Sequence, residues 1–380
     1  MELPRGLSLY RDRRVIYWFA HHVLDNVLKR AKERRLQADL IEQQSHFTMT
    51  IAKKPISGES HRPAEDDQRL MPKRSVQDKI LVVGFRTGRL GNRLVLFANV
   101  VGFAAEHGYR VVNAAFHSYA HLFENTRRDI YCRYPVARRR SLFDVIPGAA
   151  PAIRKTRIFY QMIRCASVWN YHFQILGKRV LTVREITQPT ILLDSPEVQS
   201  RMADARIVFV HGWRIRAPGS VRRHADLIRE FFRPIAEYEE ASRQAVERLR
   251  QKADVIVGVH IRLGDNWKWM GGQCYFPVSR YVIWMRELAE QFPGRKVAFL
   301  VCSDEPRHEQ EFPGLSVGFG PGSQMGDLYA LAECDWIFGP LSTFSQWAAF
   351  YGNKKLLFLR DQNDSVGLDR FNFTDLLEIP

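Results

Sequence analysis

The most constraining feature of the sequence is a short apolar run that ends in charged and titratable residues. Residues 255–259 read Val-Ile-Val-Gly-Val, a β-branched run typical of a buried strand. His260 and Arg262 follow this run, and Gly264 permits a turn before Asp265. Ligands of open α/β sheets bind at the carboxyl ends of parallel strands. The pattern therefore predicts a binding site here. An equally good interpretation is that His260 and Arg262 form a structural ion pair with a nearby carboxylate.

The charge of the chain restricts what it binds. The 380 residues carry a formal net charge of +15, whereas hydrophobic residues at 46% and charged residues at 26% are ordinary for a globular protein. Such an excess predicts anionic partners: nucleotide phosphates, acidic glycans, an anionic membrane surface or nucleic acid. The length allows two domains with a substantial core.

The cysteines and the apolar segments indicate the cellular compartment in which the protein is found. The five cysteines are scattered without a C-x-x-C pair, so neither a disulfide framework nor a zinc site is indicated. We expect a reducing compartment and therefore a cytoplasmic protein. We expect neither a membrane span nor a secretory signal, because no apolar run is long enough and no cleavage site follows the N-terminal stretch.

Residues 1–78 differ in composition from the rest of the chain. Residues 13–35 are predicted to form an amphipathic helix, with Phe19 and Val23 in its apolar stripe and basic residues mainly at its ends. This helix either lies on an anionic membrane surface or packs on the main body, and both interpretations stay open. The polar residues 53–78 contain Pro and Gly and are typical of a linker.

Helix and strand patterns alternate from residue 79 onward, which favours parallel sheets. We expect an N-terminal domain over residues 79–234 and a C-terminal domain over residues 235–380. The first contains strand 80–85, a glycine turn, helix 94–106, strand 110–113, strand 207–210 and a helix ending near Phe232. In the second we expect strands at 255–259, 296–302, 336–339 and 355–359, and helices at 236–252, 279–291, 327–334 and from 342–345 to Gly352.

Two further motifs give weak indications of a site. The turn Gly88-Arg-Leu-Gly91-Asn92 lacks the features of a P-loop or a dinucleotide fingerprint, so its residues alone indicate only an anion or hydroxyl site at a helix N-terminus. His117 and His121 would share one face of a helix, as metal ligands do. No third ligand is evident, and we predict no metal.

Polar residues follow three predicted strands of the second half, and these ends meet at one edge if the sheet is parallel. The segment 342–345 offers hydroxyls and backbone N–H groups to a phosphate, and Arg262 suits a two-pronged grip on phosphate oxygens. Asp304 or Asp327 is a candidate partner of a base edge or ribose, with helix capping as the alternative. Phe344 either stacks on a base or belongs to the core. The constellation indicates a nucleotide diphosphate, and its members are His260, Arg262, Asp265, Ser303, Asp304, Ser342, Thr343 and Ser345.

Five short motifs, in order, resemble those of the family 11 α-1,2-fucosyltransferases over about residues 80 to 360. His260-Ile-Arg262-Leu-Gly-Asp265 is similar to the H-x-R-R-x-D motif of fucosyltransferases, and Gly88-Arg-Leu-Gly-Asn92 to G-R-L-G-N-Q. The other matching segments are His211-Gly-Trp213, Ser303-Asp304, and Asp327-Leu-Tyr329 with Ser342-Thr-Phe-Ser-Gln-Trp347.

The resemblance implies an α/β, GT-B-like fold with two Rossmann-like domains whose parallel sheets face a cleft. It implies an inverting, metal-independent enzyme that moves fucose from GDP-fucose to a glycan hydroxyl of a surface polysaccharide or glycolipid. Arg262 would neutralise the leaving phosphate, His260 would hold the sugar or phosphate, and Asn92 would lie across the cleft. The catalytic candidates are Arg262, His260, Asp265 and Asn92, and the donor-binding candidates are Arg89, Asp304, Asp327, Ser342, Thr343, Phe344 and Ser345.

Two departures from the family pattern leave the donor sugar open. Leu263 replaces the second arginine of the motif, and Arg93 replaces the glutamine after Asn92. We hypothesise that Arg93 restores a cation from the opposite domain. The general base stays unassigned, because Asp265 serves equally well to orient Arg262.

Two other functions compete with that of an active enzyme at the inner face of the membrane. One is a non-catalytic glycosyltransferase-fold protein that binds anionic lipid or nucleic acid, as the charge of +15 suggests. Nucleic acid is disfavoured because no nucleic-acid-binding module is recognisable. The other is a catalytically degenerate relative, which the replacement at Leu263 suggests.

Overall fold

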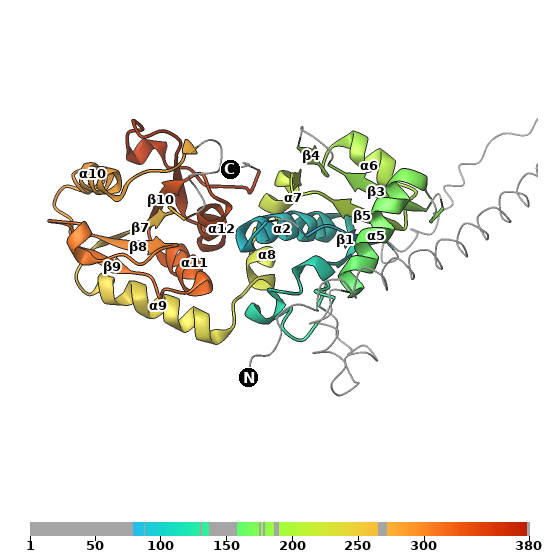
Figure 1. The fold of residues 1–380 in the computed structure, drawn as a ribbon, viewed down its shortest axis with the longest axis horizontal. Coiled ribbons are helices and arrows are strands. Elements are labelled where there is room, and N and C mark those ends of the chain that lie inside the picture. The colour runs from blue at the N-terminus through green and yellow to red at the C-terminus, as the bar shows by residue number, and fades with distance from the viewer. Residues whose placement is uncertain are drawn as a thin grey trace, which may run out of the picture. The chain divides into compact units, whose positions relative to one another are not determined.

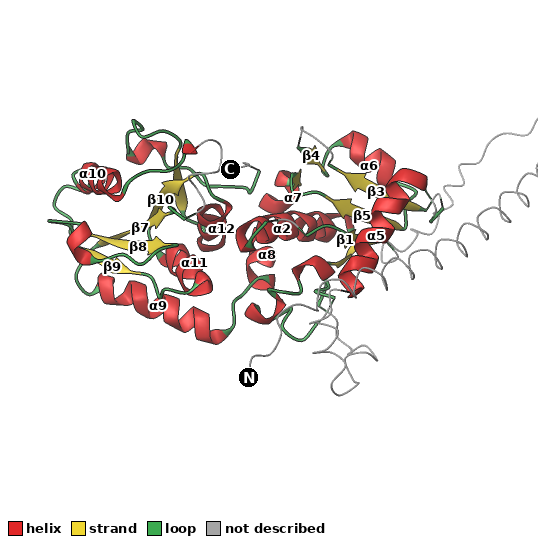
Figure 2. Cartoon of the chain, in the orientation of Figure 1, coloured by secondary structure: helices red, strands yellow, loops and turns green. Residues whose placement is uncertain are grey.

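The fold was analysed in a computed structural model. It describes residues 79–86, 88–129, 131–136, 158–174, 176–177, 179–185, 190–264 and 272–377. The predicted N-terminal helix and linker (1–78), most of the basic segment 127–157 and Asp265 lie outside these residues. Figure 2 draws the residues that are not described in grey.

The first half is built on a parallel sheet of four strands in the order β2-β1-β5-β3. Its interior positions are β-branched or aliphatic, as in a sheet covered on both faces. Two short strands, β4 and β6, pair beside it. The strands are β1 (Ile80–Val83), β2 (Arg110–Val112), β3 (Val180–Arg184), β4 (Ile191–Leu192), β5 (Ile207–His211) and β6 (Ile215–Arg216).

Helix α2 (Leu90–His107) is the central helix of this half, and it is buried nearly all round (Figure 1). Its apolar residues occupy every face, as predicted for a helix inside a domain. It ends at Gly108, which adopts the left-handed conformation (φ 69°) usual after a helix. The other helices are η2 (Ala114–Phe116), η3 (Ala120–Leu122), α5 (Ile158–Phe173), α6 (Pro196–Met202), α7 (Pro218–Arg223) and α8 (Ala225–Phe231).

The second half has a parallel sheet of five strands in the order β11-β10-β7-β8-β9. Counted in chain order from β7, this is 5-4-1-2-3, the arrangement of a doubly wound nucleotide-binding sheet. The strands are β7 (Val255–Ile261), β8 (Val297–Ser303), β9 (Val317–Phe319), β10 (Trp336–Pro340) and β11 (Lys355–Leu359). The helices are α9 (Ala236–Arg250), α10 (Val278–Ala289), η5 (Glu309–Glu311), α11 (Gln324–Glu333), α12 (Thr343–Gly352) and η6 (Leu368–Arg370).

The predicted fold class is confirmed: α/β and GT-B-like, with two Rossmann-like units on parallel sheets. The strands of the two sheets lie on either side of residue 234, while the exact domain boundaries stay predictions. No helix among the described residues is long and apolar enough to cross a membrane.

Three details of the predicted elements were wrong. Helix α2 begins at Leu90 rather than Leu94, so Gly91 and Asn92 belong to its first turn. Strand β7 continues through His260 to Ile261, because both residues pair with β8. The sequence patterns did not predict α5, β3 and β9, which are short or follow a strongly basic segment.

Candidate functional site

The order of the second sheet indicates where a ligand would bind. The chain passes from β7 to β8 and β9 on one side, then returns to β10 and β11 on the other, so the direction of winding reverses between β7 and β10. In doubly wound sheets the ligand crevice lies at this reversal, outside the carboxyl ends of the strands. His260 and Arg262 come from β7 there, and Ser342 begins the helix after β10.

His260 is a buried histidine next to an aromatic ring. Its side chain is 6% exposed, and its ring lies 5.0 Å from the ring of Phe344, centroid to centroid. Burial, and then the charge of Arg262, lower its pKa to about 3, so it is neutral at pH 7. Its Nδ1 is buried without a hydrogen-bond partner in the described part of the protein. A neutral ring with an unused nitrogen is suited to hydrogen-bonding a sugar or phosphate.

The residues after β7 are held by β8. The Leu263 N–H donates to Asp304 Oδ1 over 2.9 Å, so this candidate donor-binding carboxylate fixes the backbone that presents Arg262. A Cβ at Gly264 would lie 2.7 Å from Asp304 Oδ2, which explains the glycine. Leu263 itself is buried in the apolar core, 8% exposed, where a cation would lose its hydration.

The hydroxyls at the start of α12 are largely engaged within the protein. Ser342 Oγ caps the helix by accepting the Phe344 N–H at 3.2 Å, and Ser345 Oγ donates to the Ser342 carbonyl at 3.2 Å. Thr343 Oγ1 donates to Asn92 Oδ1 at 2.6 Å. These candidates therefore shape the helix N-terminus, and direct hydroxyl contacts to a ligand would require some of these bonds to open.

The Gly-Arg-Leu-Gly-Asn motif joins the two halves. Gly88 has φ +51°, and a Cβ there would lie 2.2 Å from Asn92 Nδ2. A Cβ at Gly91 would lie 2.7 Å from Thr343 Oγ1 and 2.9 Å from the Thr343 carbonyl carbon. Both glycines thus make room for Asn92 and α12. Because β1 and β10 lead directly into these helices, the carboxyl edges of the two sheets face each other.

Arg93 holds the glycine turn before α2. Its guanidinium donates to the Gly88 carbonyl and to Ser118 Oγ at 2.8 Å, and it lies over the Tyr119 ring at 4.9 Å. Burial lowers its pKa, yet these contacts lie within its own half. Arg93 fixes the glycine turn, and the hypothesis that it replaces the missing cation of the donor site stays a prediction. Arg89 lies exposed at the helix start without capping it.

Asp327 is a buried carboxylate near the end of β9. It is 8% exposed, and its Oδ1 accepts the Gly322 N–H at 2.8 Å. Burial raises its pKa to about 6, although the Gly322 hydrogen bond opposes the rise. A Cβ at Gly320 would lie 2.4 Å from Asp327 Oδ1, so the loop after β9 closes over this group.

The first sheet has its own polar edge, which sequence reasoning did not assign. His211 ends β5, is 5% exposed, and its Nδ1 lies 3.2 Å from Ser167 Oγ. Burial, then Arg184 and Arg164, lower its pKa to about 4. Glu185 Oε2 accepts the backbone N–H groups of Trp213 and Arg214 at 3.0 and 2.7 Å. The signal was present, since His211 ends a buried β-branched strand as His260 nearly does.

His117 and His121 do not lie on one helix. The segment forms the short 3₁₀ turns η2 and η3, and His117 Nδ1 lies 2.9 Å from the Ala114 carbonyl oxygen. The shared helical face on which the metal interpretation depended is therefore not formed. Among the described residues, no group of three or more His, Cys, Asp or Glu side chains is arranged to hold a metal ion.

Comparison with solved structures gives similarity at low identity. A substituted Arabidopsis thaliana FUT1 in complex with GDP is 14% identical with a TM-score of 0.47, covering 79% of this chain and 74% of that chain. NodZ α-1,6-fucosyltransferase co-crystallised with GDP is 17% identical at 0.42, covering 74% and 94%. POFUT1 in complex with GDP is 13% identical at 0.40, covering 73% and 94%. Neither protein-family comparison nor comparison with curated proteins gives a match. Similarity at these values assigns neither a family nor an activity.

Proposed function

We propose that this protein is a fucosyltransferase that moves fucose from GDP-fucose to a glycan hydroxyl. The observation that carries the proposal is the position of His260 and Arg262. They leave the carboxyl end of β7 at the reversal of a nucleotide-binding sheet, beside the N-terminus of the helix after β10. The resemblance of the same residues to the fucosyltransferase motif supplies the choice of sugar.

The proposed reaction is a direct, inverting displacement. The acceptor hydroxyl oxygen bonds to the anomeric carbon while the bond from that carbon to the β-phosphate oxygen breaks. The electron pair of that bond goes to the phosphate, next to Arg262, and the hydroxyl proton goes to a base that stays unassigned. A guanidinium already in place stabilises the developing charge more than water does, because it needs no reorientation. His260, neutral and buried, adds a hydrogen bond without adding charge. We propose no metal ion in this step.

The location and partners of the enzyme are also proposals. The net charge of +15 and the basic residues of the N-terminal stretch support a cytoplasmic enzyme in peripheral contact with an anionic membrane. Its acceptor would then be a surface polysaccharide or a lipid-linked glycan. The linkage formed is left open, since the α-1,2 bond rests on the resemblance alone.

Thermal unfolding with nucleotides tests the donor site. GDP and GDP-fucose should raise the Tm of the wild type by a few degrees, since a ligand at 100 times its Kd stabilises by about 2.7 kcal/mol. UDP and UDP-sugars should not. Arg262→Ala should abolish the shift, and Arg248→Ala, which removes an exposed arginine from α9, should keep it. A Tm shift with UDP compounds instead would support a nucleotide site on this sheet and exclude GDP-fucose as the donor.

A second candidate is a protein that binds the nucleotide without transferring a sugar. The observation in its favour is Leu263, which occupies the second arginine position and is buried in the core. Stabilisation by GDP-fucose together with no release of fucose to water or to any acceptor would favour this candidate.

A further inference from the structure

Four arginines at or near the carboxyl edge of the first sheet have no carboxylate partner among the described residues. Arg86 follows β1, Arg164 lies on α5, Arg184 ends β3 and Arg216 ends β6. None of them forms an ion pair within the described part of the chain. Some peripheral arginines of this half are paired, as Arg223 is with Glu106, Arg133 with Asp129 and Arg127 with Glu124. Within the described residues, no ion pair neutralises the four guanidinium groups at the edge.

Arg216 is the most deeply buried of the four. It is 1% exposed, and its Nη1 donates to the carbonyls of Trp213 and Ile215 at 2.5 and 3.2 Å. Its Nε is buried with no hydrogen-bond partner among the described residues. Burial lowers its pKa to about 10, and Glu185 only partly opposes this. A buried cation with an unused donor is costly unless an anion accompanies it.

Arg184 has the same feature on the neighbouring strand. Its Nε is also buried without a partner, while its guanidinium lies 5.0 Å from the Tyr171 ring and its Nη1 lies 3.1 Å from His172 Nε2. Arg184 pairs in register with His211, whose ring therefore lies on the same face of the sheet. Helix α5 covers this face, since its Ser167 contacts His211 (Figure 1).

The carboxylate of Glu185, whose charge acts on Arg216, is already used. Glu185 accepts the N–H groups of Trp213 and Arg214, and its Oε1 lies 3.9 Å from Arg214 Nε. Gly212, with φ +149°, allows the turn to close on Glu185, because a Cβ there would lie 2.6 Å from the Glu185 Cβ. Glu185 thus orders the Trp213 turn and balances Arg214, which leaves the other guanidinium groups to a ligand.

We propose that this edge binds an acidic group, a carboxylate or a phosphate, carried by the acceptor glycan. The assignment to the acceptor rests on the proposed function, in which the donor occupies the facing edge of the second sheet. Guanidinium N–H groups match the paired oxygens of a carboxylate or phosphate. The acidic group orients the acceptor so that its neighbouring hydroxyl points toward the donor.

Binding of a charged sugar and its uncharged ester tests the proposal. The full-length protein is titrated calorimetrically, without donor, with trigalacturonate, with its full methyl ester and with inorganic phosphate. Trigalacturonate or phosphate should bind, and the ester should bind at least about tenfold more weakly than the acid, the value of one charge-assisted hydrogen bond. Tighter binding of phosphate than of trigalacturonate would identify a phosphorylated acceptor. Because no donor is present, failure of GDP-fucose as the donor does not affect this result.

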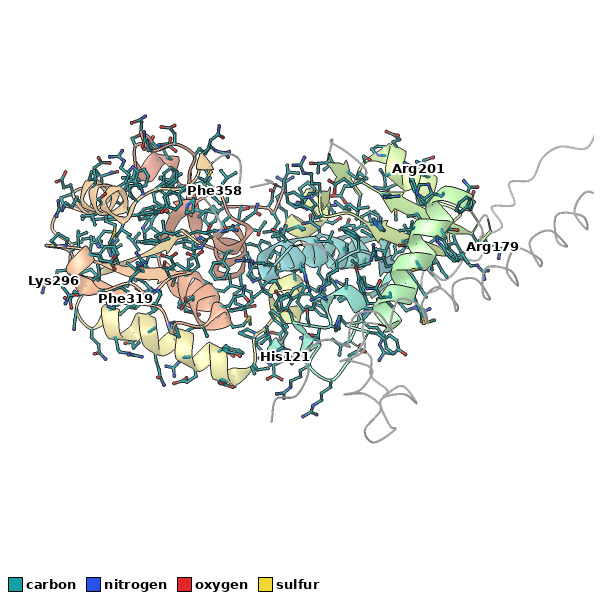
Figure 3. The ribbon with its side chains drawn as sticks, in the orientation of Figure 1. His121, Arg179, Arg201, Lys296, Phe319 and Phe358 are labelled. Atoms are coloured by element: carbon teal, nitrogen blue, oxygen red, sulfur yellow. The ribbon has the colours of Figure 1, made fainter. Side chains whose placement is uncertain are left out.

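Matched variants locate the site on the edge. Arg86→Gln and Arg184→Gln should each weaken anion binding by about tenfold while the Tm stays near that of the wild type. Arg179→Gln and Arg201→Gln remove the same charge from exposed positions, labelled in Figure 3, and should change binding less than twofold. Arg179 directly precedes β3, at the opposite edge of the sheet from Arg184. Equal binding of acid and ester, no binding of any probe, or equal losses in all four variants would overturn the proposal.

Discussion

The carboxyl edges of the two sheets differ in how far their polar side chains are hydrogen-bonded within the protein. At the second edge, Asp304 accepts the Leu263 N–H, Ser342 caps α12, and Thr343 bonds to Asn92. At the first edge, Arg184 and Arg216 keep buried N–H groups without partners. Polar groups bonded within the protein hold a shape, whereas unbonded ones are available to a ligand.

This contrast separates positioning from recognition. The second edge is preorganised, because most of its side chains hydrogen-bond to other groups of the protein. Of its buried side chains described above, His260 keeps a ring nitrogen without a partner among the described residues. Such rigidity suits a nucleotide, whose phosphates need fixed N–H groups. The first edge carries several positive charges, so it selects negatively charged ligands. Four tests distinguish these roles, from the largest expected effect to the smallest.

Loss of Arg262 should reduce catalysis and spare acceptor recognition. Arg262→Ala should lower the transfer rate at least about a hundredfold, because removal of a preorganised donor costs about 3 kcal/mol in the barrier. Trigalacturonate binding should change less than about twofold, since the first edge is intact. Initial rates with GDP-fucose and calorimetry on the same preparation measure both. An equal loss of both functions would show that the two edges do not act separately.

The pH dependence of stability should show the burial of Asp327. Its pKa is raised to about 6 from an unfolded value of 3.8, so the folded state binds more protons and loses stability as pH rises from about 4 to 6. Asp327→Asn keeps an oxygen for the Gly322 N–H and removes this loss. Its stability gain over wild type should grow between pH 4.5 and 7.5, by up to about 2 kcal/mol. A gain that is the same at both pH values would contradict the raised pKa.

Gly91 tests how tightly the two edges are joined. Alanine in a helix is intrinsically better than glycine by about 1 kcal/mol, so Gly91→Ala would raise the Tm if its surroundings were open. The added Cβ instead meets the Thr343 backbone, and overpacking costs about 1 to 3 kcal/mol. We therefore expect a lower Tm and slower transfer. Gly314→Ala, where φ is +77° and no atom lies within 4 Å of the new Cβ, measures backbone strain alone. A higher Tm for Gly91→Ala would disprove the close approach.

The smallest effect should come from the hydrogen bond between Asn92 and Thr343. A double-mutant cycle with Asn92→Ala and Thr343→Val should give a coupling free energy of about 1 kcal/mol, measured by denaturant unfolding. The Asn113→Ala and Thr343→Val pair, whose members have no contact in the structure described here, serves as the control and should be additive. A coupling free energy of zero between Asn92 and Thr343 would show that this hydrogen bond does not stabilise the contact between the two halves.

Much of the second half could be predicted from local patterns. Its strands are continuous apolar runs and its helices have clear ends, so polar residues after β7, β8 and β10 could be expected at one edge of a parallel sheet. The first half was harder to predict. Strand β3 was not predicted, and its buried Thr182 bonds to Asn170 and to the Ser167 carbonyl of α5, contacts that no local pattern reveals.

The roles within the site depended on contacts between distant residues. Thr343 was a candidate phosphate ligand, but its hydroxyl bonds to a residue 251 positions earlier. Helix α2 was expected to begin after Asn92, because Gly and Asn are poor helix formers. Packing against α12 overrides that preference. Arg93 was hypothesised to replace a cation, and the sequence alone did not reveal its bonds to Gly88 and Ser118.

The fit of Gly91 against Thr343 also restricts how this protein can be recombined with others. A chimera that joins the first half of one protein to the second half of another inherits the glycine motif from one parent and the start of α12 from the other. Only parents that share a small residue at position 91 and a hydroxyl at position 343 will reproduce the contact. Exchange of acceptor specificity by domain shuffling should therefore succeed when residues 88–92 stay with the second half that they fit.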